Sequence, residues 1–158
     1  MKLKYTLLAA ALASTIGYAG MTTAATTTNS FDAIITIEKS CDVSTGISDM
    51  DFGTANFQTV TPIDKQTTIT VKCTQDASYD VGLSGSGSMN NGSDTIAYAM
   101  YSDASRSTSW GSTLGTDTVA GTGDGTDQTM TVYGRVASIP ATAPAGNYSD
   151  TVTVTVTY

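Results

Sequence analysis

Histidine is absent from the 158-residue chain, and cysteine occurs only twice. Without histidine, the chain cannot build the Ser/His or Cys/His arrangements of nucleophilic enzymes, or the histidine sites of copper and zinc proteins. Cations are also few, because seven lysines and arginines stand against 14 acidic residues. This balance argues against nucleic-acid binding and against docking on anionic lipid, both of which need clustered cations. We therefore expect no catalytic site, no metal, no other cofactor and no nucleic-acid partner.

A long apolar run is lacking too, and the one short run lies at the N-terminus. Lys2 and Lys4 precede the apolar residues 7–16, and small residues follow through Ala25, which is the layout of a secretory signal peptide. The run is too short to span a bilayer, so we expect no membrane insertion of the mature chain. Cleavage after Ala19 or Ala25 fits this pattern. We favour Ala25, which leaves 133 residues, enough for one domain.

The two cysteines, Cys41 and Cys73, lie 32 residues apart in the mature chain. An isolated pair in an exported protein is typical of one structural disulfide. A redox or metal site is the alternative, but the pair has no CxxC spacing. We expect a Cys41–Cys73 disulfide, which would stabilise the fold by roughly 3–4 kcal/mol in the loop-entropy treatment.

The strongest signal in the mature chain is alternation of apolar and polar residues over its last eight positions. Val152, Val154, Val156 and Tyr158 occupy one face there, and threonines occupy the other. This is the pattern of a strand with one buried face. Because this strand ends at Tyr158, nothing in the chain follows to pair with its outer edge.

Further strands are predicted upstream, and no window has the period of about 3.6 residues that marks a helix. Alternation is clear over residues 68–73 and weaker over 79–83 and 130–136, while 96–101 are strand-prone without a clear inward face. Stretches rich in Gly, Ser, Thr, Asp or Pro predict loops or hairpin connections at 84–93 and 111–127, and a connection into the last strand at 139–146. About six or seven short strands with frequent turns indicate an all-β, immunoglobulin-like sandwich.

One more apolar-faced segment lies ahead of the disulfide loop. Phe31, Ala33, Ile35 and Ile37 alternate with mostly polar residues before Cys41. Periodicity by itself favours the first strand of a closed, monomeric sandwich. A segment used by another molecule is the alternative.

Several short motifs carry a resemblance through their order and spacing. They are the cysteine after the alternating segment, MDFG at 50–53, VKC at 71–73, AYAMYSD at 97–103, VYGR at 132–135 and the ending at 146–158. With these motifs the chain resembles spore coat protein U domain proteins, the archaic Csu-type pilins of chaperone–usher fibres. The resemblance runs from the signal peptide to Tyr158.

The resemblance implies an incomplete sandwich that lacks its final G strand. A periplasmic chaperone would fill the resulting groove first, and the N-terminal segment of another pilin subunit would replace it at the outer-membrane usher, by donor-strand complementation. The N-terminal segment, residues 26–37, would donate and the domain 38–158 would accept. Donor residues would be Phe31, Ala33, Ile35 and Ile37, and groove residues would be Val152, Val154, Val156 and Tyr158.

The function implied by the resemblance is structural: a subunit exported to the periplasm and then to the cell surface, in a fibre for adhesion and biofilm formation. Two other functions stay open. One is a secreted, closed, lectin-like binding module, for which Trp110 would be an exposed binding aromatic. The other is a coat protein that does not polymerise. We expect Trp110 to cap the core instead.

Overall fold

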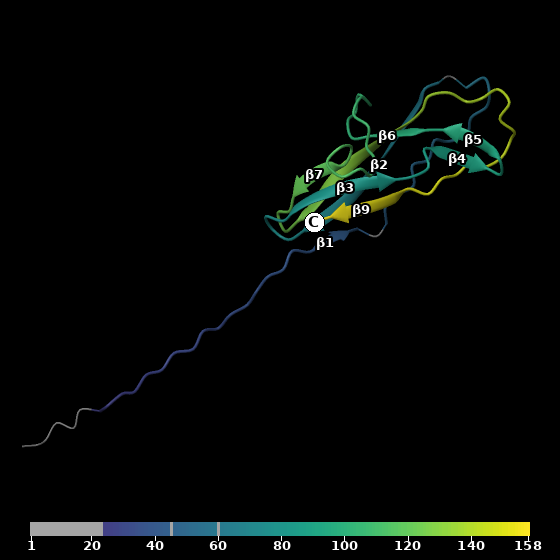
Figure 1. Cartoon of the computed structure of the whole chain (residues 1–158). Helices are drawn as coiled ribbons and strands as arrows, with labels where there is room; N and C mark the ends of the chain where they lie inside the picture. Colours follow the sequence, from purple (N-terminus) through teal and green to yellow (C-terminus); the bar gives the residue numbers. More distant parts are fainter. Residues whose placement is uncertain (1–23, 45, 60) are drawn as a thin grey trace, which may run out of the picture. The chain divides into compact units, whose positions relative to one another are not determined.

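The computed structural model describes residues 24–44, 46–59 and 61–158, and Figure 1 shows their arrangement. Most of the predicted signal peptide, residues 1–23, lies outside these ranges. The chain divides into two units, Met1–Ile35 and Thr36–Tyr158, and we call the second unit the body. The described ranges contain strands and no helix, so no helix that could cross a membrane is found in them.

All nine described strands belong to the body. They are β1 (Cys41–Val43), β2 (Ile63–Cys73), β3 (Ser78–Ser84), β4 (Ser88–Asn91), β5 (Asp94–Ala97), β6 (Ala99–Tyr101), β7 (Val119–Thr122), β8 (Asp127–Val136) and β9 (Thr153–Thr157). One sheet has the order β1-β2-β8-β6, a second has the order β7-β3-β9, and β4 and β5 form a separate hairpin. Every described pairing is antiparallel, which confirms the all-β prediction.

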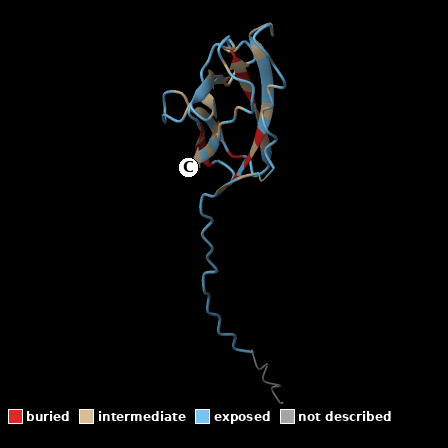
Figure 2. Cartoon of the chain, turned by 90° about the vertical axis from the view of Figure 1, so that its right-hand side faces the viewer, coloured by how far each residue is buried: buried red, intermediate tan, exposed pale blue. Residues whose placement is uncertain are grey.

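The core lies between the two larger sheets, as in a sandwich. Ile69, Val71 and Val132 from the first sheet pack in one cluster with Val81 and Leu83 from the second. In Figure 2 these buried stretches are red on the strands of the body. Alternation explains the arrangement, because β2 buries Ile69, Val71 and Cys73 while the residues between them point outward.

Two side-chain predictions are confirmed in the core. Cys41 and Cys73 are joined in a disulfide that links β1 to β2. Trp110 is only 4% exposed, and its indole Nε1 donates a hydrogen bond to the Val81 carbonyl across 2.8 Å. Trp110 therefore caps the core and offers no exposed ring for a sugar.

Two of the stretches predicted as loops or hairpin connections contain strands of their own, and a hairpin turn lies within 84–93. The expected loop 84–93 contains β4, which pairs with β5 through a turn at Gly92, where φ is 62°. The expected loop 111–127 contains β7, which pairs with β3. β4 is mostly polar, and β7 places only Val119 against the core, so neither strand has the repeated apolar alternation that marks a strand in a sequence.

Candidate functional site: a groove beside the last strand

β9 is an edge strand of its sheet. Val154 pairs with Leu83 and Val156 with Val81 along the β3 side, and within the described residues no strand pairs with the opposite edge. Such an edge presents unpaired backbone N–H and C=O groups that can accept another strand. β1 is the corresponding edge of the other sheet, and it contacts β9. Because β1 spans only Cys41–Val43, the sandwich is open beyond the end of β1, along the free edge of β9.

The predicted groove residues lie along this side, although not equivalently. Val152, Val154 and Val156 are half-buried and pack against the core. Val152 and Val154 line a cavity, whereas Val156 lies outside its lining. Tyr158 follows the end of β9 and is 57% exposed.

The cavity has a volume of about 610 Å³ and is built from both sheets. The buried side chains of Ile69, Leu83 and Val132 form its base. Residues 47–52 and 148–154 supply much of the remaining lining. An apolar base beside a free strand edge is suited to an inserted strand, because alternate side chains can enter the cavity while the backbone pairs with β9.

A second cavity of about 640 Å³ continues from the first. The two cavities share the lining residues Met50, Asp51, Phe52, Met89 and Tyr148, so we treat them together as the groove. The second cavity is lined largely by residues 50–57 and 139–148, which are loops in the structure.

Sequence reasoning missed the contribution of residues 50–52 to the groove. These residues lie over β8 at Gly134, where any added Cβ atom would collide with Met50 and crowd Phe52. Phe52 also packs against Tyr98, with 6.3 Å between the ring centroids. The sequence marks these residues only by the MDFG motif. The motif has no strand periodicity, so it indicated a family and did not predict where residues 50–52 lie in the fold.

A hydrogen-bonded pair, Tyr98 and Asp150, lies in the lining of the first cavity. The Tyr98 hydroxyl donates a hydrogen bond to Asp150, and the Ser86 backbone N–H donates another across 2.8 Å. The Tyr98 hydrogen bond lowers the pKa of Asp150, and burial, followed by the bond to Asp150, raises the pKa of Tyr98. At neutral pH the pair is therefore a neutral phenol bound to a charged carboxylate, which anchors the chain just before β9.

The N-terminal segment has no strand in the structure. Its large apolar side chains are exposed: Phe31 by 91%, Ile34 by 85%, Ile35 by 83% and Ile37 by 72%. Ala33 is exposed as well. Ile34 lies between two predicted donor residues, Ala33 and Ile35. Because side chains alternate along a strand, a strand that buries Ile35 leaves Ile34 on its other face. Exposed apolar residues gathered in one segment are typical of an interaction site.

The pattern of the family described as Spore Coat Protein U domain matches residues 27–155. The chain belongs to this family. The match begins inside the N-terminal segment and ends within β9, so it covers both the segment and the groove.

A solved structure supports this placement of the U domain. The chain resembles a chain in the crystal structure of the CsuC–CsuE chaperone–tip adhesion subunit pre-assembly complex from archaic chaperone–usher Csu pili of Acinetobacter baumannii. The two are 26% identical with a TM-score of 0.56, over 78% of this chain and 40% of the other. This chain therefore spans less than half of its relative's length. No curated protein sequence shows significant similarity to this one.

Proposed function

We propose that this U domain protein is a structural, non-enzymatic subunit of a chaperone–usher pilus, and that it polymerises by donor-strand complementation. The observation that carries the proposal is that one chain contains both an open groove with an apolar base beside β9 and an exposed apolar segment. In the fibre, residues 26–37 of one subunit fill the groove of another copy or of a related pilin. The fibre is exposed at the cell surface, where it serves adhesion and biofilm formation.

The spacing and the burial energy suit this insertion. Phe31, Ala33, Ile35 and Ile37 recur every second residue, as do the valines beside β9. Burying these three large apolar side chains, with a smaller term for Ala33, contributes roughly 5–10 kcal/mol, and each ladder hydrogen bond adds about 0.5–1.5 kcal/mol. Association and ordering reduce this total, yet the surplus is large enough for a stable joint.

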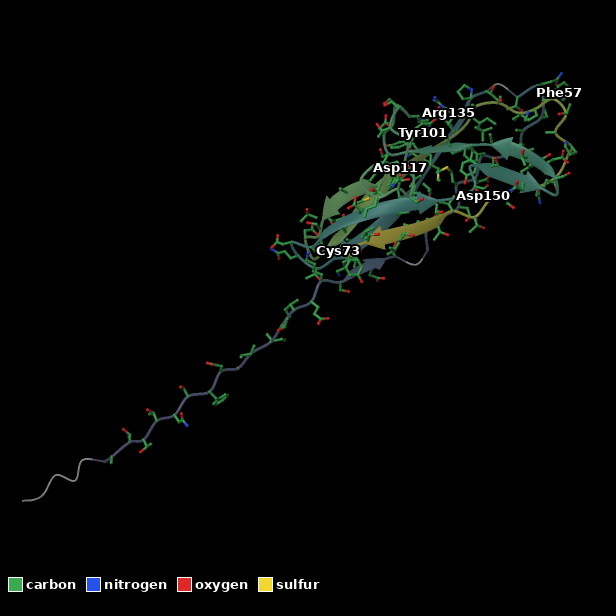
Figure 3. All side chains as sticks on the ribbon, in the orientation of Figure 1. Phe57, Cys73, Tyr101, Asp117, Arg135 and Asp150 are labelled. Carbon is green, nitrogen blue, oxygen red and sulfur yellow. A yellow bond between two sulfur atoms is a disulfide. The ribbon has the colours of Figure 1, made fainter. Side chains whose placement is uncertain are left out.

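The two ends of the body favour one direction of insertion. One end of the body contains Cys41, Cys73 and Thr157. We call it the exit pole, since residues 36–40 enter β1 at this end. Ile63 and Val136 pair at the opposite end of β2 and β8, the far pole, which the second cavity reaches. Figure 3 shows Cys73 and Phe57 at these opposite ends of the body.

A donor strand that runs antiparallel to β9 brings its own body to the far pole of the acceptor. Each subunit then donates from its exit pole and accepts at its far pole, a head-to-tail contact that repeats into an open filament. A donor parallel to β9 would instead bring two exit poles together and close a pair. The antiparallel direction is therefore the one that we assign to the fibre.

The open groove also supports the partners that the proposal requires. A subunit with an open groove exposes an edge strand and apolar side chains, which promote aggregation. A periplasmic chaperone that lends a strand to the groove protects the subunit after export through the signal peptide. The outer-membrane usher then exchanges the chaperone strand for the N-terminal segment of another subunit.

A truncated body tests the proposal. A variant lacking residues 26–37 should bind a peptide of residues 26–38 in a stable one-to-one complex that unfolds at a higher denaturant concentration than the body alone. In the full chain, Ile35→Asp should prevent polymerisation, whereas Ile34→Asp should permit it because Ile34 faces away from the groove. A truncated body that is a stable monomer and ignores the peptide would leave the closed binding module or the coat protein as the function.

A further inference from the structure

Thr74 binds the stretch that connects the N-terminal segment to β1. Its hydroxyl accepts a hydrogen bond from the Ser40 backbone N–H across 3.0 Å. The same hydroxyl lies within hydrogen-bond distance of two carbonyls, that of Ser40 at 3.3 Å and that of Glu38 at 3.4 Å. The Thr74 backbone N–H donates to the Ser40 carbonyl across 2.8 Å. We call this set of contacts the Thr74 clip.

The body side of the clip is rigid. Thr74 follows Cys73, whose disulfide to Cys41 fixes the start of β1. The turn after Thr74 is bound to Gly123, which accepts from the Asp76 N–H and donates to the Ala77 carbonyl. A Cβ atom at Gly123 would collide with the Thr74 carbonyl, so the two backbones are in close contact. Thr74 therefore holds residues 38–40 in the direction in which they approach β1.

This direction matters because each chain carries both a donor segment and a groove. The N-terminal segment could insert into the groove of its own body, which would compete with polymerisation. We call this self-insertion. Chain reach excludes such self-insertion antiparallel to β9. Phe31 and Ile37 would be about 20 Å apart as a strand, with Ile37 toward the far pole. The four residue steps from Ile37 back to Cys41 span at most about 14 Å.

Self-insertion parallel to β9 is within reach. Ile37 would then lie near the exit pole, and residues 38–40 would form a three-residue hairpin loop into β1, a common connection. To make this loop, the chain must reverse direction at residues 38–40. The reversal breaks the hydrogen bonds that Thr74 makes with Glu38 and Ser40, so the clip opposes this path.

We propose that the Thr74 clip disfavours self-insertion and thereby commits the N-terminal segment to a second subunit. This inference rests on the proposed function. Thr74 acts as a positioning residue for assembly, because it contacts the connection to the donor segment rather than the groove.

The test is refolding of the mature chain without a chaperone in wild-type, Thr74→Val and Thr70→Val forms. Valine keeps the shape of threonine and removes its hydroxyl. Thr70 is the matched control, because it lies on β2 four residues before Thr74, and within the described residues its hydroxyl bonds only to that of Thr129, across 3.2 Å. Size-exclusion chromatography gives the fraction of closed monomer, defined as monomer that does not bind the peptide of residues 26–38. Loss of one such bond should raise the ratio of closed monomer to polymer about 2- to 12-fold for Thr74→Val.

The outcomes separate the clip from the function on which it rests. A raised closed-monomer fraction in Thr74→Val, with Thr70→Val equal to wild type, supports the clip. An unchanged fraction in Thr74→Val, or an equal rise in Thr70→Val, overturns the clip while polymerisation stands. If wild type forms no polymer and the truncated body ignores the peptide, both proposals are wrong. Amide exchange at Ser40 gives a second readout, because it should be faster in Thr74→Val than in Thr70→Val.

Discussion

The Tyr98 hydroxyl donates a hydrogen bond to the Asp150 carboxylate, with 2.7 Å between Oη and Oδ2. Tyr98 lies between β5 and β6, and Asp150 lies just before β9, so the bond joins two chain segments that line the groove. Tyr98→Phe removes the bond and keeps the ring that packs against Phe52. We expect the free energy of unfolding of the peptide-filled body to fall by about 1–2 kcal/mol. Urea unfolding followed by far-UV circular dichroism measures the change.

Tyr101→Phe is the control for this substitution, because within the described residues the Tyr101 hydroxyl makes no hydrogen bond. It should leave the urea midpoint almost unchanged. Equal midpoints for Tyr98→Phe and Tyr101→Phe would show that the bond to Asp150 does not stabilise the groove.

The same pair predicts a dependence on pH. The Tyr98 hydrogen bond, assisted by Ser86, lowers the pKa of Asp150 below its ordinary value of 3.8. A carboxyl group whose pKa is lower in the folded state stabilises that state above its unfolded pKa, and the contribution is lost as the pH falls through the folded value. The difference in stability between wild type and Tyr98→Phe should thus be constant from pH 7 to about 5 and shrink below pH 4. Urea midpoints over this range would contradict the assignment if the difference grew toward low pH.

Gly134 provides a separate prediction about the groove. Because a Cβ atom there would collide with Met50, Gly134→Val should displace residues 50–52 from β8. The truncated body should then bind the peptide of residues 26–38 at least about tenfold more weakly, which corresponds to roughly 1.4 kcal/mol. Isothermal titration calorimetry measures the affinity.

A double-mutant cycle tests whether the effect passes through Met50. If Gly134→Val acts by displacing Met50, the combination with Met50→Ala should cost less than the sum of the two single changes. Additive losses would mean that Gly134 acts on the groove by another route.

The sequence predicted those parts of the fold in which one face of a strand is buried. Val152, Val154 and Val156 alternate with threonines because their side chains pack on the core, so the period of two is visible without coordinates. β4 and β5 lack this signal. Met89 and Ile96 are directly paired, but glycine, serine and asparagine flank Met89, a composition equally typical of a loop, and Ile96 is the only large apolar residue of β5.

The candidate site was predictable only on its β9 side. The other contribution, from residues 50–52, depends on a close approach to Gly134, which joins positions more than 80 residues apart in the sequence. Residues 139–148 line the second cavity as irregular backbone. Long-range packing of irregular segments leaves no periodic trace, so pattern reasoning alone could not place them in the groove.

The disulfide should contribute strongly to the stability of the body. Cys41 and Cys73 close a loop of 32 residues, and replacing both by alanine should lower the free energy of unfolding by about 3–4 kcal/mol. Denaturant unfolding of the peptide-filled body measures the loss. The double variant is preferable to either single one, because a lone cysteine can cross-link two molecules.

Wild type under reducing conditions is the matching control for the double variant. It should unfold at the same denaturant concentration as Cys41→Ala/Cys73→Ala, whereas oxidised wild type should be more stable. Titration of native, oxidised protein should find no free thiol. Two reactive thiols in native protein would refute the bond.

Arg106 and Arg135 share the carboxylate of Asp64, yet they should differ in their effect on stability. Arg135 pairs with Asp64 across 2.7 Å at a site where its side chain is 31% exposed. Arg106 lies 3.3 Å from the same oxygen, but its side chain is only 13% exposed. It also donates from Nε to the Gly134 carbonyl across 3.2 Å and lies over the Tyr133 ring.

An exposed ion pair contributes little to stability, so Arg135→Met should lower the free energy of unfolding only slightly, and by less than Arg106→Met does. Arg106→Met removes hydrogen bonds from a charged donor to backbone carbonyls and a cation–π contact, so the loss should be about 1.5–3 kcal/mol.

Added salt separates the ion pair from the hydrogen bonds as the cause of each loss. Wild type and Arg135→Met should become nearly equal in 1 M NaCl, where the screening length falls to about 3 Å. The deficit of Arg106→Met should persist, because the hydrogen bonds of this partly buried guanidinium to the Gly134 and Lys65 carbonyls are screened less than an exposed ion pair. Equal losses for both arginines, or a deficit in Arg106→Met that salt abolishes, would show that Arg106 acts only through its charge.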